Sequence, residues 1–269
     1  MRFTKEFKVK PGSKIRLSKY DPEETLGWHK GHKMEASLDK AIQAMDNLQF
    51  RLSAERKQAL LIVLQGLDTA GKDGTIRHVM SGINPQGCRV TPFKVPTAEE
   101  AAHDFLWRIH KAVPEHGEIV IFNRSHYEDV LVVRVHKLVP KEVWSSRYGE
   151  INEFEQILAS SGTRILKFFL HISRDEQRKR LLQRIDDPDR QWKISEADFH
   201  ERKFWSDYTA AYESALSKCS TDSAPWFIIP ANKKWFRNLA ISHIIAETLG
   251  DMNPKFPAPT VDVAKIKFS

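Results

Sequence analysis

Cysteine is scarce in this chain. Its 269 residues include only Cys88 and Cys219, too few for a disulfide framework and without the spacing of metal ligands. We expect both thiols to be small buried groups. No apolar run approaches the roughly 20 residues of a membrane span, and the basic start MRFTKEFKVKPGSK lacks the apolar core of a signal peptide. These absences predict a cytoplasmic protein with no membrane partner.

Negative charge is in the minority. Lys and Arg number 42 against 35 Asp and Glu, which gives a net charge of +7. Such an excess indicates polyanionic substrates or partners, without saying whether these are nucleic acid or smaller anions. Internal repeats and low-complexity tracts are also absent, and the length suits one α/β domain better than two independent cores.

Hydrophobic periodicity predicts the order of the elements. Apolar residues at spacings of three and four predict a long amphipathic helix over 34–57. Short apolar runs predict five strands, at 59–65, 89–93, 119–122, 165–171 and 226–229. Helical patterns follow at 72–83, 97–112, 125–136, 140–160, 174–185, 196–218 and 232–249. This alternation predicts a three-layer α/β fold around a doubly wound, parallel, five-stranded sheet.

The stretch LLIVLQGLDTAGKDG has the Gly-x4-Gly-Lys spacing of a phosphate-binding loop. Gly66 follows a predicted strand and Lys72 begins a predicted helix, which is the context that this motif requires. Glycines let backbone N–H groups turn toward an anion, and the helix N-terminus adds positive dipole. An ordinary turn with a solvated lysine is the alternative. The predicted phosphate contacts are Gly66, Leu67, Thr69, Ala70, Gly71, Lys72, Asp73 and Gly74.

Two aspartates make this loop atypical. Asp73 stands where such loops carry the Ser or Thr that binds Mg2+, and Thr75 lies two positions further on. Asp68 would lie beside bound phosphates, where a carboxylate is repelled unless a divalent cation or a proton transfer compensates it. We therefore expect Mg2+ as the cofactor, with Mn2+ as an alternative. An Asx turn that shapes the loop is the other interpretation of Asp68.

The third predicted strand ends in IVIFNRSHYEDV. Nucleotide kinases normally carry Asp-Arg at this strand tip, whereas this chain has Asn123-Arg124. An arginine at the carboxyl end of a parallel strand lies in the crevice where open α/β sheets bind ligands. Arg124 is therefore the expected anion clamp, and a surface arginine that caps a loop is the alternative.

Five stretches in order along the chain resemble the polyphosphate kinase 2 family. They are GLDTAGKDG, TPFKVPTAEEAAHDFLWRIH, FNRSHYEDVLVVRV, HISRDEQRKRLLQRIDDPDRQWK and APWFIIPANKKWFRNLAI. The likeness covers about residues 5–260, and Asn123 with Tyr127-Glu128-Asp129 resembles the class III branch. It implies a P-loop kinase fold and phosphoryl transfer between inorganic polyphosphate and nucleotides, namely AMP, ADP and ATP, with guanine nucleotides left open. It also implies a homo-oligomer.

The resemblance implies a role for each candidate residue. Asp68, Lys72 and Arg124 would be catalytic, with Arg180 and Arg184 closing on the transferred phosphate as an arginine finger does. Asn123 and Glu128 would contact the nucleotide. The metal would bind Asp68, Asp73 and Asp129, with Asp129 or Glu128 replacing the carboxylate that Asn123 lacks. A polyphosphate track would consist of Arg89, Lys94, Arg108, Lys111 and Arg178, although any one of them could be a solvated surface residue.

The predicted organisation has three parts. Residues 1–35 form a polar extension without a core element, and residues 36–250 form the P-loop kinase domain. A helical lid occupies about 174–205, where DDPDRQWK breaks the helical pattern. Residues 251–269 form a tail whose prolines in NPKFPAP stop any helix and favour a strap along the surface.

Two rival functions remain open. An ATP-using nucleoside or nucleotide kinase of the same fold would need the same loop, arginine and lid. A nucleic-acid binder would explain the positive charge, but the sequence contains no recognition motif for it. We therefore expect no nucleic-acid partner.

Overall fold

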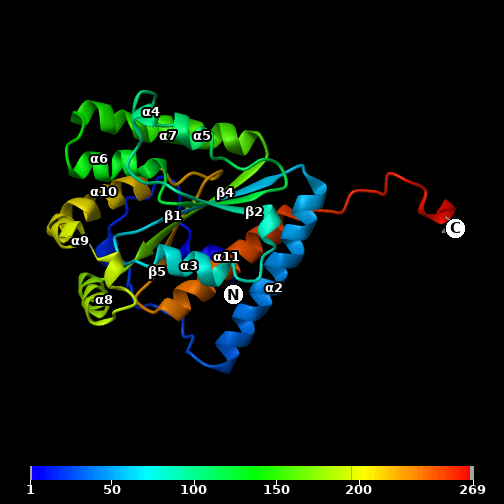
Figure 1. Ribbon diagram of the computed structural model, residues 1–269, viewed down its shortest axis with the longest axis horizontal. Helices are drawn as coiled ribbons and strands as arrows, with labels where there is room; N and C mark the ends of the chain where they lie inside the picture. Colours follow the sequence, from blue (N-terminus) through cyan, green and yellow to red (C-terminus); the bar gives the residue numbers. More distant parts are fainter. Residues whose placement is uncertain (1, 195, 267–269) are drawn as a thin grey trace.

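Five parallel strands form the centre of the computed structural model, which describes residues 2–194 and 196–266 (Figure 1). Their spatial order is β2-β3-β1-β4-β5, with β1 (Ala59–Gln65), β2 (Cys88–Pro92), β3 (Ile119–Asn123), β4 (Thr163–His171) and β5 (Trp226–Pro230). The chain visits β2 and β3 on one side of β1 before it crosses to β4 and β5 on the other. The predicted doubly wound sheet is confirmed, and its switch point lies at the carboxyl end of β1.

Helices cover both faces of this sheet (Figure 1). Leu60, Ile62 and Leu64 of β1 face one layer, while Leu61 and Val63 face the other. The first layer contains α1 (Phe3–Phe7), α2 (His32–Glu55), α3 (Lys72–Val79) and α11 (Lys234–Met252). The second contains α5 (Trp107–His110), η3 (His126–Val130), α6 (Val132–Val135), α7 (Lys141–Ser160) and α10 (Trp205–Lys218). Burial between two apolar layers explains why β1, β3 and β5 are apolar on both sides, whereas β2, at the edge of the sheet, is partly exposed.

The remaining elements are short or lie at the carboxyl edge of the sheet. They are η1 (Leu17–Lys19), η2 (Pro85–Gly87), α4 (Ala98–Ala101), α8 (Arg174–Asp186), η4 (Gln191–Lys193), α9 (Glu196–Glu201), η5 (Arg202–Phe204) and η6 (Val263–Lys265). No helix in the described ranges is both long and apolar enough to cross a membrane. Met1, Ser195 and residues 267–269, which fall in the predicted extension, lid and tail, lie outside the described residues.

Three predicted helices are interrupted in the structure. The helix predicted over 97–112 is two single turns, α4 and α5, because the Asp104 side chain accepts a hydrogen bond from the Leu106 N–H and makes a turn between them. The helix predicted over 125–136 is a 3-10 helix followed by α6, and the helix predicted over 196–218 is α9, η5 and α10 in succession. Apolar spacing was correct in these segments, but it does not detect a local change of backbone.

The N-terminal segment belongs to the core, contrary to the prediction for residues 1–35. Phe3 and Phe7 are buried against α11, while Val9, Ile15 and Leu17 join the opposite layer.

The tail prediction holds only at its start, where Phe256 packs edge-on against Phe50 of α2; beyond it the ribbon runs away from the body (Figure 1). Of the two thiols, Cys219 is buried as expected but Cys88 is only partly buried.

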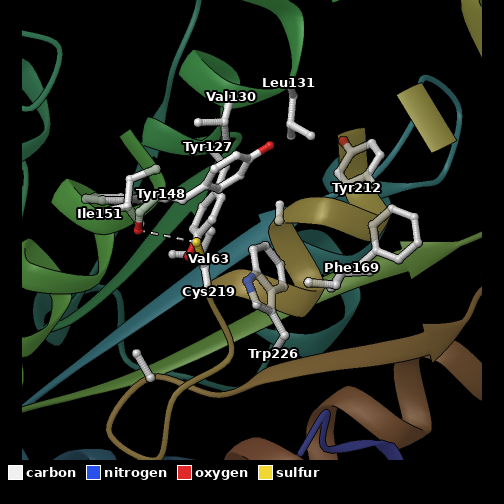
Figure 2. Close-up of a cluster of buried hydrophobic side chains, with 14 of the residues drawn as sticks. Val63, Tyr127, Val130, Leu131, Tyr148, Ile151, Phe169, Tyr212, Cys219 and Trp226 are labelled. Atoms are coloured by element: carbon white, nitrogen blue, oxygen red, sulfur yellow. Dashed lines mark hydrogen bonds between the residues drawn. The ribbon is translucent and has the colours of Figure 1, made fainter. Parts of the chain in front are cut away.

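A buried ion pair fixes the segment that follows β3. Lys167 of β4 donates to Glu155 of α7, to the Tyr127 hydroxyl and to the Cys219 carbonyl, at 2.5, 2.8 and 2.5 Å. Tyr127 donates in turn to Glu155 at 2.9 Å, and both charged groups are almost inaccessible to solvent. Figure 2 shows Tyr127 surrounded by Val63, Val130 and Trp226. The ion pair therefore ties η3, which begins two residues after Arg124, to the middle of the sheet.

Replacing Glu155 by Gln should destabilise the fold by about 3–5 kcal/mol, because Lys167 would remain charged and buried without a counter-ion. Glu153→Gln is the matched control, since Glu153 is an exposed glutamate on the same helix. Urea-induced unfolding followed by far-UV circular dichroism measures both variants. Equal, small losses would show that the pair carries no stabilising charge interaction.

Candidate active site

The phosphate loop connects β1 to α3 at the switch point. Gly66 and Gly71 have φ angles of +157° and +102°, and the left-handed Gly71 precedes the first helical residue, Lys72. A Cβ would crowd the neighbours of either glycine. One on Gly66 would lie 3.0–3.1 Å from Ala70 and Leu170, and one on Gly71 would overlap the guanidinium group of Arg237 unless that group moved. The predicted loop is thus present with the backbone that its glycines require.

Lys72 lies at the centre of a group of charges. Its ammonium group donates to the Gly66 carbonyl at 2.8 Å, so the side chain folds back over the loop. Burial lowers the pKa of Lys72 and Arg124 acts in the same direction, whereas the carboxylates of Asp68, Glu128 and Asp73 oppose both. Two cations and three carboxylates therefore interact at the mouth of the loop.

The backbone conformation of Arg124 and a hydrogen bond to Asp68 together orient the Arg124 side chain. Its φ of +63° is left-handed, a conformation that costs about 1–2 kcal/mol for a residue with a Cβ. Its guanidinium group donates to Asp68 at 3.0 Å and is 41% exposed, which leaves room for a further anion. Partial burial acts to lower the pKa of Arg124, but Glu128 and Asp68 outweigh it and the pKa is raised. The predicted clamp thus reaches the loop.

The two aspartates of the loop have different partners. Asp68 pairs with Arg124, while Asp73 accepts a hydrogen bond from the Asn123 side chain at 2.8 Å. Asn123 therefore sits beside the loop as predicted. Thr75 does not supply the missing hydroxyl, because its side chain is buried and donates to the Gly71 carbonyl at 3.0 Å.

Asp129 does not join this group, contrary to the metal prediction. It accepts a hydrogen bond from Arg147 of α7 at 3.0 Å, and burial raises its pKa to about 6. The Glu128 side chain has no hydrogen-bond or ion-pair partner within the described part of the chain, and its charge acts on Lys72 and Arg124. Of the two residues left open for the missing carboxylate, Glu128 is the one that the fold brings to the loop.

Arg180 lies behind the loop rather than over it. It is buried and donates to four backbone carbonyls, those of Thr69, Ala70, Ala231 and Asn232, at 2.6–3.2 Å, while Glu176 neutralises it at 2.7 Å. The arginine-finger prediction is therefore wrong for Arg180 in this conformation, because its donors all face protein atoms. Arg184 lies one turn further along α8 and is partly exposed.

A second buried arginine, Arg237, supports the loop from the same side. It donates to the Ala70 carbonyl at 3.2 Å and to the Asn238 side chain at 2.9 and 3.1 Å. Burial, with Arg180 nearby, lowers its pKa to about 9. Sequence analysis missed this residue. The available signal was an arginine inside a largely apolar helix, where a charged group requires a partner.

The predicted polyphosphate track is only partly assembled. Lys94 is exposed just beyond the carboxyl end of β2, Lys111 is exposed over the Trp107 ring, and Arg178 is exposed on α8. Arg108 is instead buried, where it donates to the Lys94 carbonyl and pairs with Glu100. Arg89 lies at the amino end of β2, paired with Glu118 at 3.0 Å, so the fold places it away from the loop.

Gly71→Ala should lower turnover about a hundredfold, because the new Cβ would displace either the loop or the Arg237 guanidinium, and misplacement of about 1 Å at a reacting centre has effects of this size. Gly149→Ala is the matched control: Gly149 has open space around it and no left-handed φ. Steady-state turnover with thermal unfolding as the folding check measures both. Parent-like turnover in Gly71→Ala would mean that the contact with Arg237 does not position the loop.

Most of the chain is similar to proteins whose family is known. The family model "Polyphosphate kinase 2 (PPK2)" matches residues 29–257. An AMP/ADP-polyphosphate phosphotransferase of Meiothermus ruber is 50% identical over 97% of this chain and 98% of its own length. An ADP-polyphosphate phosphotransferase of Rhodopseudomonas palustris is 45% identical over 96% and 93%. The crystal structure of polyphosphate kinase 2 from Arthrobacter aurescens superimposes with a TM-score of 0.93 at 43% identity, over 98% of this chain and 94% of that one.

These matches extend over almost the whole chain, including the phosphate loop, Arg124 and the helices α8 and α11 that hold the loop. The resemblance inferred from the five motifs is confirmed. The chain belongs to the polyphosphate kinase 2 family.

Proposed function

We propose that this enzyme transfers phosphoryl groups directly, in line, between inorganic polyphosphate and both AMP and ADP. It is a polyphosphate:nucleotide phosphotransferase, as expected from its motifs and its family. The observation that carries the proposal is the arrangement of Lys72 and Arg124 around one phosphate loop, with Asp68, Asp73 and Glu128 beside them. Phosphoryl transfer asks a protein mainly to align the reactants and to neutralise charge.

Each residue of this group has a defined task in the proposal. Lys72 and Arg124 hold oxygens of the transferred phosphoryl group, and each exchanges a protein acceptor, the Gly66 carbonyl or Asp68, for phosphate. When Arg124 turns to phosphate, the Asp68 carboxylate is released to orient the acceptor phosphate or to accept its proton. The loop N–H groups and the α3 N-terminus cradle the remaining oxygens.

Mg2+ fits the carboxylates that the fold gathers here. No three His, Cys, Asp or Glu side chains within the described ranges make a complete protein metal site. Mg2+ commonly binds through one or two carboxylates together with substrate phosphates and water, so Asp68, Asp73 and Glu128 are the candidates for the protein share. Bound there, Mg2+ would neutralise charge on the phosphates. Mn2+ is the proposed substitute, because it also favours carboxylate and water ligands.

Acceptance of both nucleotides rests on two observations. The FNRSHYEDV stretch predicts the class III branch. The relative from Meiothermus ruber, which is 50% identical, is named for both AMP and ADP, whereas the relative named for ADP alone is 45% identical. Guanine nucleotides as further acceptors, a homo-oligomeric state and a cytoplasmic location stay predictions.

Asp68→Asn should lower turnover with polyphosphate and ADP by about two to four orders of magnitude while the fold survives, because an amide neither accepts a proton nor binds Mg2+ as a carboxylate does. Asp73→Asn, whose carboxylate faces the Asn123 amide, should lose less. Turnover at saturating Mg2+ is the measurement, with thermal unfolding as the folding control.

A double-mutant cycle separates two roles of Asp68, since this carboxylate also holds Arg124. If Asp68 only positions Arg124, Asp68→Asn should add little in an Arg124→Gln background. If it also acts on the acceptor or the metal, the second substitution should cause a further large loss. A tenth or more of parental turnover in the single Asp68→Asn variant would contradict both roles.

AMP incubated with excess polyphosphate and Mg2+ should be converted through ADP to ATP by this one chain, because one site accepts both nucleotides. Chromatography of the nucleotides over time is the measurement, and Lys72→Ala, which removes the loop cation, should suppress both steps. Product that stops at ADP would contradict the dual acceptor range. Transfer from ATP but from no polyphosphate would instead support the rival nucleotide kinase.

A further inference from the structure

A groove lies at the amino ends of β4 and β5, whereas the phosphate loop lies at the carboxyl ends of the strands. Its volume is about 470 Å3, and it runs between the N-terminal segment and the first residues of β4 and β5, among them Arg164, Leu166 and Phe227. Leu170, further along β4, is the residue that packs beneath Gly66. Arg164 and Leu170 are six positions apart along β4, so about 20 Å of protein lies between the groove and the loop.

Unpaired cations line this groove. Lys5, Lys8, Lys10 and Arg164 are exposed, and none of the four has an ion pair or a side-chain hydrogen bond within the described part of the chain. A fifth cation, Arg2, is already matched by Asp251 and Glu247. The groove lining contains two carboxylates, Asp251 and Asp222. The groove therefore carries a clear excess of positive charge.

The lysines stand on a fixed backbone. Lys8 forms an antiparallel bridge with Phe227, and the Val9 N–H donates to the Trp226 carbonyl at 2.8 Å. Glu247 of α11 accepts hydrogen bonds from the N–H groups of Phe3 and Thr4 at 2.9 and 3.0 Å. Phe7 and Val9 point into the core, so Lys8 and Lys10 alternate outward, as residues of an extended segment do. Ordered cations lose less entropy when they bind an anion.

We propose that this groove is a second anion-binding site, which holds a distant part of the polyphosphate chain whose end reacts at the phosphate loop. The proposal rests on the use of polyphosphate proposed above. A polymer with about one negative charge per phosphate gains from every cation that it meets, by analogy with nucleic-acid backbones. Anchoring the polymer in the groove raises the effective concentration of its end near the loop. Tripolyphosphate is too short to reach both places.

A triple variant tests the groove, namely Lys5→Gln with Lys8→Gln and Lys10→Gln. Its matched control is Lys30→Gln with Lys40→Gln and Lys141→Gln, three exposed lysines outside the groove that remove the same charge. We expect KM for long-chain polyphosphate to rise about tenfold in the groove variant, as the sum of three exposed charge contacts. KM for tripolyphosphate and turnover at saturation should match the control. The salt dependence of long-chain KM should also become shallower.

Equilibrium binding separates this inference from the proposed function. Isothermal titration of long-chain polyphosphate measures the groove without turnover, so loss of affinity in the groove variant supports the site even if polyphosphate proves a poor donor. Equal affinity and equal KM in the two triple variants would overturn the inference. Selective loss of affinity for a single-stranded oligonucleotide, with polyphosphate unaffected, would overturn the choice of ligand.

A change of oligomeric state and a single-residue variant provide further tests of the groove. A changed mass in size-exclusion chromatography with unchanged polyphosphate binding would make the groove a contact between copies of this chain, and would overturn the site. If the triple variant fails to fold, Arg164→Gln alone tests the site, because this exposed side chain makes no hydrogen bond or ion pair with any described residue. A parental KM for long polyphosphate in that variant would count against the groove.

Discussion

The site depends on two guanidinium groups buried behind the phosphate loop. Arg180 and Arg237 both donate to the Ala70 carbonyl, and Arg180 also binds the neighbouring Thr69 carbonyl. Because the Ala70 carbonyl is held toward the protein, the N–H of the same peptide, that of Gly71, faces the other way, toward the place of the anion. The Ala70 N–H instead donates to the Leu67 carbonyl at 3.0 Å, which closes a turn inside the loop. Two nearby buried cations with one carboxylate partner, Glu176, are costly for folding. Their bonds to main-chain oxygens offset part of that penalty and hold the Thr69 and Ala70 carbonyls in place.

The charges in front of the loop have a different character. Three carboxylates, Asp68, Asp73 and Glu128, interact with two cations, Lys72 and Arg124, so the protein alone leaves this group with one excess negative charge. Phosphates would enlarge the imbalance. A divalent cation, as proposed above, would correct it and leave Lys72 and Arg124 available to individual oxygens. The aspartate inside the loop therefore makes physical sense together with a metal, and its pairing with Arg124 keeps both side chains ordered beforehand.

Prediction from sequence succeeded where signals were local and redundant. The five strands have apolar runs bounded by polar residues, and all five appear within two residues of their expected limits. It failed where a local side-chain hydrogen bond or a tertiary contact overrides the apolar pattern. A single hydrogen bond from Leu106 to Asp104 interrupts a helix without changing its apolar spacing. The same holds for charge: Arg180 and Arg184 look alike on a helical wheel, and only the packing of α8 against the loop turns Arg180 inward.

The N-terminal segment gave the most misleading signal, because its many lysines hide the apolar residues between them. Phe3, Phe7 and Val9 enter the core, and this burial fixes the lysines on the outside.

The positive charge of the protein lies mainly away from the phosphate loop. The charged side chains at the loop sum to a slightly negative charge, so the net charge of +7 resides elsewhere on the molecule. Exposed cations of this kind attract a long polyanion at a distance, and in the proposed mechanism Lys72, Arg124 and Mg2+ would neutralise its reacting phosphate. Separating the two tasks allows the loop to keep the carboxylates that the chemistry needs.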